Sequence, residues 1–173
     1  MNERFVTELR RQGGALAELT RSNGHAALQP GPPQLAASGP RVAGRERDYE
    51  LLLEMIYEGS ILHYGEPRVV VPDDPDLGLL LGDQLYALGL ARLAELGDLD
   101  AVAELADVIS LVSQAHADGD GELARAVWEA GAVSIGWGSS AELRAAKRAV
   151  RAHDPTAAAR LTQASAERRS RGL

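Results

Sequence analysis

The amino-acid sequence predicts an all-α protein, a compact antiparallel helical bundle, and three observations support this class. Apolar residues make up 45% of the 173-residue chain but aromatic residues only 4%, so the core must consist mainly of leucine, alanine and valine, a composition that favours helices. Apolar residues recur at helical spacing in successive segments. Short turns separate these segments, and such turns join antiparallel neighbours. A chain of this length suits a single folding unit.

Residues 1–22 are predicted to form an N-terminal helix that depends on docking. Gly13 and Gly14 interrupt its apolar pattern, and each glycine costs roughly 1 kcal/mol relative to alanine. Residues 23–44 follow, and their glycines, serines and alanines are interspersed with prolines: Pro30, Pro32, Pro33 and Pro40. Because such a composition does not sustain a helix, we predict an extended linker or mobile loop.

Residues 45–168 are predicted to form the helical bundle domain. Residues 45–63 place apolar side chains on one side of a helix, residues 69–71 are short and extended, and residues 72–76 form a turn that caps the next helix. That helix runs from about residue 77 to 96. Its glycines lie close to one face and predict tight packing against another helix: Gly78, Gly82 and Gly89.

The second half of the bundle is predicted from caps and periodicity. One helix is expected to follow the turn of residues 97–100 and to run to about Ala117, and another is expected over residues 122–135. Ser139 and Glu142 form a capping-box pattern for a helix that ends near His153. Asp154 and Pro155 then begin a final helix through about Glu167, and residues 169–173 are predicted to fray.

Charge and composition exclude several classes of function. The net charge of −7 and pI near 5.1 argue against a nucleic-acid-binding surface. Absence of cysteine excludes disulfides and thiolate metal sites. No apolar run approaches the roughly 20 residues that span a bilayer, and the N-terminus lacks a secretory signal pattern, so cytoplasmic residence is expected. One basic cluster is interpreted as a solvated helix face near a helix C-terminus: Arg144, Lys147, Arg148 and Arg151.

Three segments carry a resemblance to a known family. An apolar helix contains Glu54 with the pair Ser60 and His63, a second segment reads Leu81-Gly82-Asp83-Gln84-Leu85, and Ser113-Gln114 lies late in the next long helix. In this order they resemble the trans-isoprenyl diphosphate synthases, the polyprenyl synthetases, over about residues 48–138. The resemblance implies the N-terminal part of the isoprenoid synthase fold. The retained motif positions are Glu54, Ser60, His63, Gly82, Asp83, Leu85 and Gln114.

The chain departs from this family where catalysis would occur. The resemblance places metal-binding aspartates after His63, but Tyr64 and Gly65 stand there, and magnesium requires carboxylate ligands. The second aspartate-rich motif and the isopentenyl-diphosphate-binding element have no counterpart. The resemblance therefore implies a catalytically silent subunit with no catalytic residue, metal or cofactor, associating with itself or with a full-length polyprenyl synthetase paralogue. Residual prenyltransferase activity would require a catalytic partner.

Other acidic and histidine patterns have structural interpretations. Three aspartates near residue 74 could attract a cation but are better suited to a capping turn. Four acidic residues match positions of a calcium-binding loop, yet Leu123 occupies the position that requires glycine. His63 and His116 are expected to have structural roles. The acidic residues concerned are Asp73, Asp74 and Asp76 in the first group and Asp118, Asp120, Glu122 and Glu129 in the second.

Two alternatives to a silent synthase-like subunit stay open. The chain could be a prenyl-chain or lipid-binding module that holds its ligand in an apolar cleft between helices 45–63 and 77–96. It could also be a helical scaffold protein unrelated to isoprenoids. No Gly-x-Ser-x-Gly motif and no phosphate-binding glycine loop with lysine occurs, so hydrolase and nucleotide-dependent chemistry have no support.

Overall fold

The computed structural model describes residues 3–21 and 31–172 and confirms the all-α class. The helices within these residues are α1 (Glu3–Gln12), α2 (Gly14–Leu19), α3 (Pro32–Ala37), α4 (Glu46–Tyr64), α5 (Pro75–Glu95), α6 (Leu99–Ala117), α7 (Gly121–Trp137), α8 (Ala141–Arg151) and α9 (Ala157–Ser170), with a short 3-10 helix η1 (Pro40–Val42). The one β-type contact in the described part of the chain is an isolated antiparallel bridge between Thr20 and Val70.

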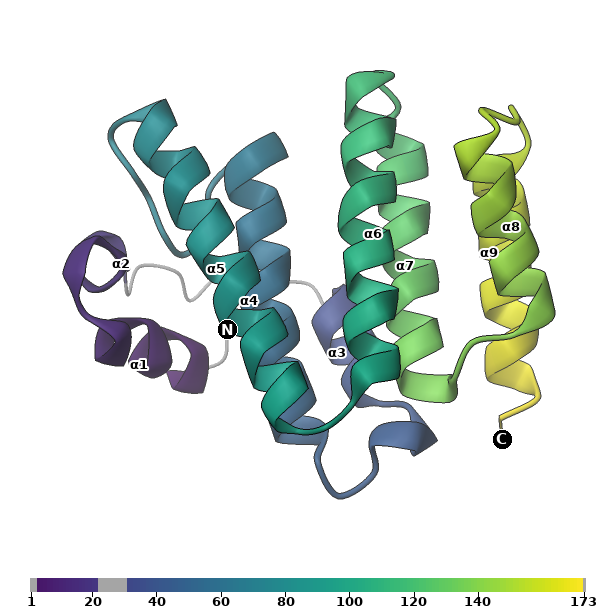
Figure 1. The fold of residues 1–173 in the computed structure, drawn as a ribbon, viewed down its shortest axis with the longest axis horizontal. Coiled ribbons are helices and arrows are strands. Elements are labelled where there is room, and N and C mark those ends of the chain that lie inside the picture. The colour runs from purple at the N-terminus through teal and green to yellow at the C-terminus, as the bar shows by residue number, and fades with distance from the viewer. Residues whose placement is uncertain (1–2, 22–30, 173) are drawn as a thin grey trace.

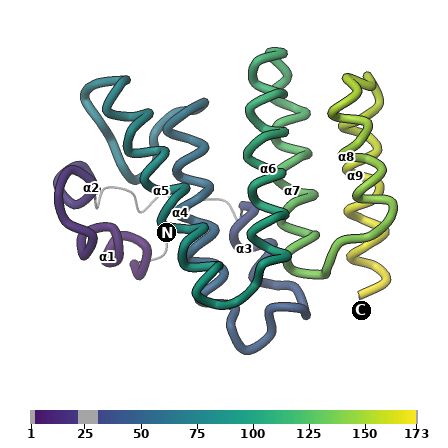
Figure 2. The backbone as a smooth tube through the Cα atoms, in the orientation of Figure 1, coloured from purple at the N-terminus to yellow at the C-terminus, as the bar shows by residue number. Residues whose placement is uncertain are grey.

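The helices lie in two layers (Figure 1). Helices α5, α6 and α8 form one layer, α4, α7 and α9 form the other, and α3 lies between α4 and α7. From α4 onward, consecutive helices run in alternating directions (Figure 2), as the short turns predicted. The α1–α2 pair packs beside α4 and α5, at the edge of the molecule farthest from α8 and α9.

Glycines bring α4 and α5 into close contact, as their spacing predicted. A side-chain carbon added at Gly82 would lie 2.8 Å from the His63 ring, and one added at Gly89 would lie 2.4 Å from Ile56. A carbon added at Gly59 of α4 would lie 2.9 Å from the Gly82 carbonyl oxygen. Any larger side chain at these positions would push the helices apart, so no ligand-sized cleft separates them here.

Two apolar clusters form the core. The larger cluster joins α4 to α3 and to the four helices from α6 to α9, and includes Leu52, Leu105 and Ile135. The smaller cluster joins α1 and α2 to α4 and α5 and includes Phe5, which is 1% exposed, and Leu85. Full burial of one such side chain contributes roughly 1.5–3 kcal/mol, which explains how a glycine-interrupted N-terminal segment is held in place.

The prediction of an extended linker over residues 23–44 is wrong for the part that the structure describes. Residues 32–37 form α3 and residues 40–42 form η1, and Ala36 and Val42 are fully buried. Pro32 and Pro40 stand in the first turn of their helices, where a missing N–H breaks no helical hydrogen bond. These prolines begin helices instead of preventing them. Residues 23–30 lie outside the described residues.

Helix ends also differ from the sequence predictions. The single helix expected over residues 1–22 is two helices, because the backbone turns at Gly13 with a φ of 73°. Helix α8 is capped by the Ser140 hydroxyl, which accepts from the Leu143 N–H at 3.1 Å, one residue later than predicted. Helix α9 begins at Ala157 and extends to Ser170, into the segment predicted to fray.

Tertiary contacts explain the added length of α9. The Arg168 guanidinium donates to the Gly138 carbonyl oxygen at 2.8 Å and also to the Trp137 carbonyl oxygen. These bonds tie the last turns of α9 to the α7–α8 connection. Residue 173 lies outside the described residues.

Helix α5 is long and apolar enough to span a membrane by length and composition, and 33% of its most apolar window is buried. This differs from the expectation that no apolar run reaches such a length. Core helices of soluble proteins meet the same criterion, so length and composition alone do not assign α5 to a bilayer. What the structure adds is that much of this apolar helix is left uncovered, with Leu80 66% exposed.

Candidate functional site

The C-terminal end of α4 holds the positions where the family resemblance breaks down. Gly65 ends the helix, and its N–H donates to the Ile61 carbonyl oxygen at 2.8 Å. The Tyr64 ring stacks on His116 of α6, with ring centroids 4.4 Å apart and planes at 8°. A stacked ring and a helix cap therefore occupy the two positions where metal-binding aspartates would stand.

His63 lies in the same series of stacked rings. Its ring centroid is 5.3 Å from that of Tyr86 and 5.6 Å from that of Tyr64, which in turn covers His116. The two histidines do not meet, because Tyr64 lies between them. Burial raises the pKa of Tyr86 to about 12, although a hydrogen bond with Ser60 acts in the opposite direction. This phenol is therefore neutral at ordinary pH.

Ser60 and Asp83 show how the retained motif positions are used. The Ser60 hydroxyl, 4% exposed, accepts from the Trp128 indole N–H at 3.3 Å and so joins α4 to α7. The Asp83 carboxylate is 71% exposed and lies 3.2 Å from His63 Nε2, without the alignment of a hydrogen bond. Gln114 lies elsewhere, where its amide donates to the Val150 carbonyl oxygen at 2.9 Å. Its role is to join α6 to α8.

A buried ionic cluster beneath the end of α4 was not predicted. The Arg68 guanidinium donates to Glu58 Oε2 at 2.9 Å and to Glu54 Oε2 at 3.0 Å. Glu58 also accepts from the Val69 and Val70 N–H groups at 2.7 and 3.1 Å. Burial lowers the pKa of Arg68, but the charges of Glu58 and Glu54 outweigh this effect and raise it overall. Both carboxylates are thus committed to partners within the protein.

The sequence did contain a signal for this cluster. Glu54 and Glu58 are one helical turn apart on a helix whose other residues are mostly buried. Two buried carboxylates require a cation or several donors nearby. Arg68, the first basic residue after them other than the histidine, could have been inferred as that cation.

An aromatic pocket of about 440 Å³ opens between α4, α6 and α7, beside Tyr64. Trp128 and Tyr57 form one wall, meeting edge to face with centroids 5.0 Å apart. The cleft predicted between helices 45–63 and 77–96 is wrong, because α4 and α5 touch through their glycines. The apolar space lies instead on the side of α4 that faces α7. The main lining residues of the aromatic pocket are Tyr57, Ser60, Ile61, Tyr64, His116, Ala124 and Trp128.

The acidic clusters serve as helix caps. Asp74 caps α5 by accepting from the Asp76 N–H at 2.8 Å, and Asp120 caps α7 by accepting from the Leu123 N–H at 2.8 Å. The capping interpretation is therefore confirmed for the group around Asp74, and the cap formed by Asp120 was not predicted. Within residues 3–21 and 31–172, no three His, Asp or Glu side chains are arranged to hold a metal ion.

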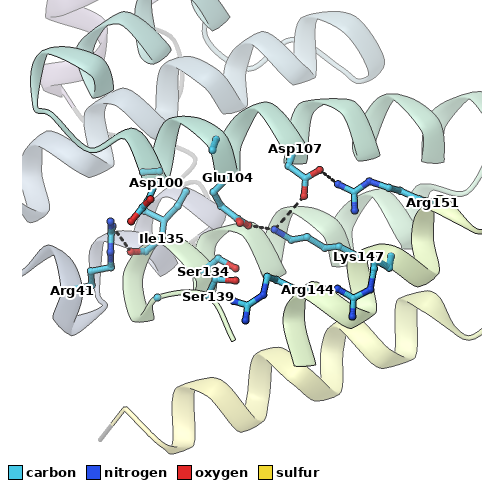
Figure 3. Close-up of a pocket in the computed structure, with 14 residues that line it drawn as sticks. Arg41, Asp100, Glu104, Asp107, Ser134, Ile135, Ser139, Arg144, Lys147 and Arg151 are labelled. Carbon is cyan, nitrogen blue, oxygen red and sulfur yellow. Dashed lines mark hydrogen bonds and ion pairs between the residues drawn. The ribbon is translucent and has the colours of Figure 1, made fainter. Parts of the chain in front are cut away.

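A charged groove of about 750 Å³ opens between α6, the end of α7 and α8 (Figure 3). Its basic lining residues are Arg41, Arg144, Lys147, Arg148 and Arg151, and its acidic lining residues are Asp100, Glu104 and Asp107. Basic groups outnumber acidic ones in the groove, although the whole chain carries a net charge of −7. The groove is therefore a local positive region on an acidic protein.

The interpretation of residues 144–151 as a solvated basic face is wrong for Lys147. This side chain is 4% exposed, and its ammonium group pairs with Glu104 and lies 3.6 Å from Asp107. Arg151 also pairs with Asp107. Periodicity within α8 could not reveal this arrangement, because the acidic partners lie on α6.

Comparisons of this chain with protein-family models, with curated proteins and with solved structures find no match.

Proposed function

We propose that this chain is a catalytically silent, polyprenyl synthetase-like subunit that works by associating with a second copy of itself or with a complete polyprenyl synthetase. The arrangement of side chains at the end of α4 supports the absence of catalysis. Tyr64 there is stacked on His116, and the nearby carboxylates of Glu54 and Glu58 are bound to Arg68. Ionisation of an allylic diphosphate needs metal ions or cations placed against the developing charge. The side chains at this position do not supply them.

Exposed leucines on the face near the start of α5 support the associating role. Leu79 and Leu80 are 44% and 66% exposed. The helix that carries them is apolar enough to resemble a core helix. Exposed apolar residues gathered on one element are typical of surfaces that bind another protein. We therefore place the contact on this face of α5.

Light scattering after gel filtration tests the association directly. The wild-type chain is expected to form a dimer alone, or a stable complex when mixed with a full-length synthase from the same genome. Leu80→Glu should abolish that complex, since it places a charge in an apolar contact. Ala159→Glu, at an exposed position on α9, is the matched control and should leave it intact.

Prenyl-transfer assays of the synthase with and without this chain complete the test. Bound subunit is expected to change the rate or the product chain length. The proposal fails if the protein stays monomeric, recovers no synthase and leaves both quantities unchanged. It also fails if the purified chain with magnesium turns over labelled allylic diphosphates.

The aromatic pocket favours a second candidate, a module that retains an apolar chain without converting it. A pocket of about 440 Å³ with aromatic walls falls within the size range of small-molecule sites. Native mass spectrometry with farnesol should detect a one-to-one complex. Ile61→Trp places a larger side chain in the pocket and should abolish the complex with farnesol. Wild-type protein without bound alcohol would exclude this function.

A further inference from the structure

The wall of the charged groove formed by α7 and α8 contains a polar group without a partner. The Ser134 hydroxyl belongs to a residue that is 5% exposed and makes no hydrogen bond within the described part of the chain. Ser134 also lines the groove, and Figure 3 places it with Ser139 and Arg144, across from Glu104 of α6. A buried hydroxyl without a partner is costly, and because Ser134 belongs to the lining of the groove, a ligand bound there would supply the missing acceptor.

Two guanidinium groups that line the same groove as this hydroxyl are available for a ligand. Arg144 and Arg148 are one turn apart on α8 and both line the groove. Neither is among the salt bridges of the described residues, whereas the neighbouring Lys147 and Arg151 pair with acidic residues of α6. The acidic side of the groove is thus largely neutralised, and the arginines on the opposite side retain their charge.

The N–H groups at the start of α8 already have partners and do not contribute to this site. The Ser140 hydroxyl accepts from the Leu143 N–H, and hydrogen bonds with its own backbone N–H and with Ser140 lower the pKa of Glu142. An incoming anion would therefore be held by side chains. Hydroxyl groups and forked guanidinium groups are donors that match the several oxygens of a tetrahedral oxyanion.

We infer that the charged groove binds a phosphate group through Ser134, Arg144 and Arg148, with Ser139 as a further donor. The groove, at about 750 Å³, is far larger than a bare phosphate ion, and it extends to Arg41, at the end away from Arg151 in Figure 3. A small phosphate monoester, with its organic part in that extension, fits these dimensions better than inorganic phosphate. This inference does not depend on the proposed association or on the aromatic pocket.

Calorimetric titration of the full chain with phenyl phosphate and with inorganic phosphate tests the inference. Saturable one-to-one binding of phenyl phosphate is expected, with a Kd below about 1 mM. Tighter binding of phenyl phosphate than of inorganic phosphate identifies an ester as the ligand, and equal binding identifies free phosphate. Phenol, which lacks the phosphate group, should not bind. Absence of saturable binding by both phosphates overturns the inference.

Ser134→Ala is the decisive variant because it is expected to fold. Removing a hydroxyl that has no protein partner should leave the melting temperature unchanged or raise it, while phosphate affinity falls about tenfold. Ser165 of α9 is an equally buried and unpartnered hydroxyl outside the groove. Ser165→Ala should therefore retain wild-type affinity. Wild-type binding by Ser134→Ala, or equal losses in both variants, would refute the assignment.

Substitutions of arginine residues provide a second, independent test of phosphate binding. Arg148→Gln should weaken phosphate binding about tenfold, the loss expected for one charge-assisted contact. Arg125→Gln removes an exposed arginine of α7 that lines the aromatic pocket instead and should have no effect. If both variants lose affinity equally, the binding reflects overall charge and the site is refuted.

Discussion

The molecule contains two ionic clusters, and they differ in which charge is the more deeply buried, the acidic one or the basic one. In the closed cluster of Glu54, Glu58 and Arg68, the acids are 6% and 0% exposed, and the arginine, 18% exposed, covers them. In the open cluster of Glu104, Asp107, Lys147 and Arg151, the lysine is 4% exposed and Asp107 is 25% exposed. The first joins α4 to a loop, and the second lines the charged groove.

The difference in burial indicates which cluster contributes more to folding stability and which is more sensitive to water and salt. Glu58 is bound by two backbone N–H groups as well as by Arg68, so its removal leaves several donors without partners. The acids of the open cluster remain partly hydrated and share their cations. We expect the closed cluster to contribute more to stability and to depend less on salt.

Glu58→Ala should have the largest effect on stability. It leaves the buried Val69 and Val70 N–H groups without their acceptor and leaves Arg68 with Glu54 alone of its two carboxylates, and breaking such a buried pair costs about 3–5 kcal/mol. Urea unfolding measures this loss. Glu129→Ala, at an exposed site on α7, should change stability by less than about 0.5 kcal/mol. A loss below about 1 kcal/mol for Glu58→Ala would contradict the role of the closed cluster.

Replacement of Asp98, at the turn between α5 and α6, should cause the second-largest loss of stability, and this loss should depend on pH. Hydrogen bonding to Arg41, opposed by burial and aided by the Tyr49 hydroxyl, lowers the pKa of Asp98 from 3.8 to about 2. The pKa of Asp98 is lower in the folded protein than in the unfolded chain. The charged carboxylate therefore stabilises the fold by about 2 kcal/mol at pH values above the unfolded pKa. That contribution is lost as the pH falls from about 4 through 2.

Unfolding of wild-type protein and Asp98→Asn at a series of pH values checks this sign. The difference between their free energies of unfolding should be about 2 kcal/mol at neutral pH and should fall towards zero as the pH approaches 2. Asparagine accepts through one oxygen only, so the variant also removes one acceptor of the Arg41 guanidinium, which donates to both oxygens of Asp98. A gap that stays constant across the acid range would show that the charge contributes nothing.

Lys147→Met should cost less than loss of Glu58, despite similar burial of the lysine. Methionine replaces the apolar stem of the lysine, and Asp107 keeps its pair with Arg151. We expect a loss of about 1–2 kcal/mol in urea unfolding, corresponding to hydrogen bonds with charged groups that are partly replaced by water. A loss equal to that of Glu58→Ala would remove the distinction between the two clusters.

Arg151→Ala should have the smallest effect. Its side chain is 49% exposed, and exposed ion pairs contribute about 0–1 kcal/mol. Raising the salt concentration should reduce even this loss, whereas the loss for Glu58→Ala should persist in salt. Stability curves at low and high sodium chloride provide the measurement. Salt-independent losses in Arg151→Ala would indicate that its apolar stem matters more than its charge.

The helices of the bundle could be predicted because their signals are local. The helix predicted over residues 45–63 agrees with α4 to within one residue at either end, and the helix predicted to end at about Ala117 ends there in α6. Apolar periodicity and, for α6, an aspartate cap are signals that lie within a few residues of the helix. Helix α3 was missed for a related reason. Proline has opposite meanings in the first turn of a helix and in its interior, and only packing against α4 and α7 decides between them.

The candidate sites were only partly predictable, because their residues come together from distant segments. Tyr64 and Gly65 were recognised as the positions that differ from the family pattern, but the stacking of Tyr64 on His116 joins α4 to α6. Ser134 gave no signal, since a serine near the end of a helix is ordinary until its hydroxyl proves to be buried and without a partner. The basic residues of α8 were visible, but the burial of Lys147 was not.

By itself, the sequence determined the all-helical class, the helices of the bundle and the presence of a tightly packed glycine face on α5, because helical periodicity, caps and glycine spacing act over a few residues. Only the tertiary structure decided which charges are buried and where the pockets open. Lys147 and Glu104 are 43 residues apart, and no local pattern distinguishes a lysine that faces water from one that faces an acidic neighbour. Burial depends on what packs against a residue, and that is a property of the assembled helices.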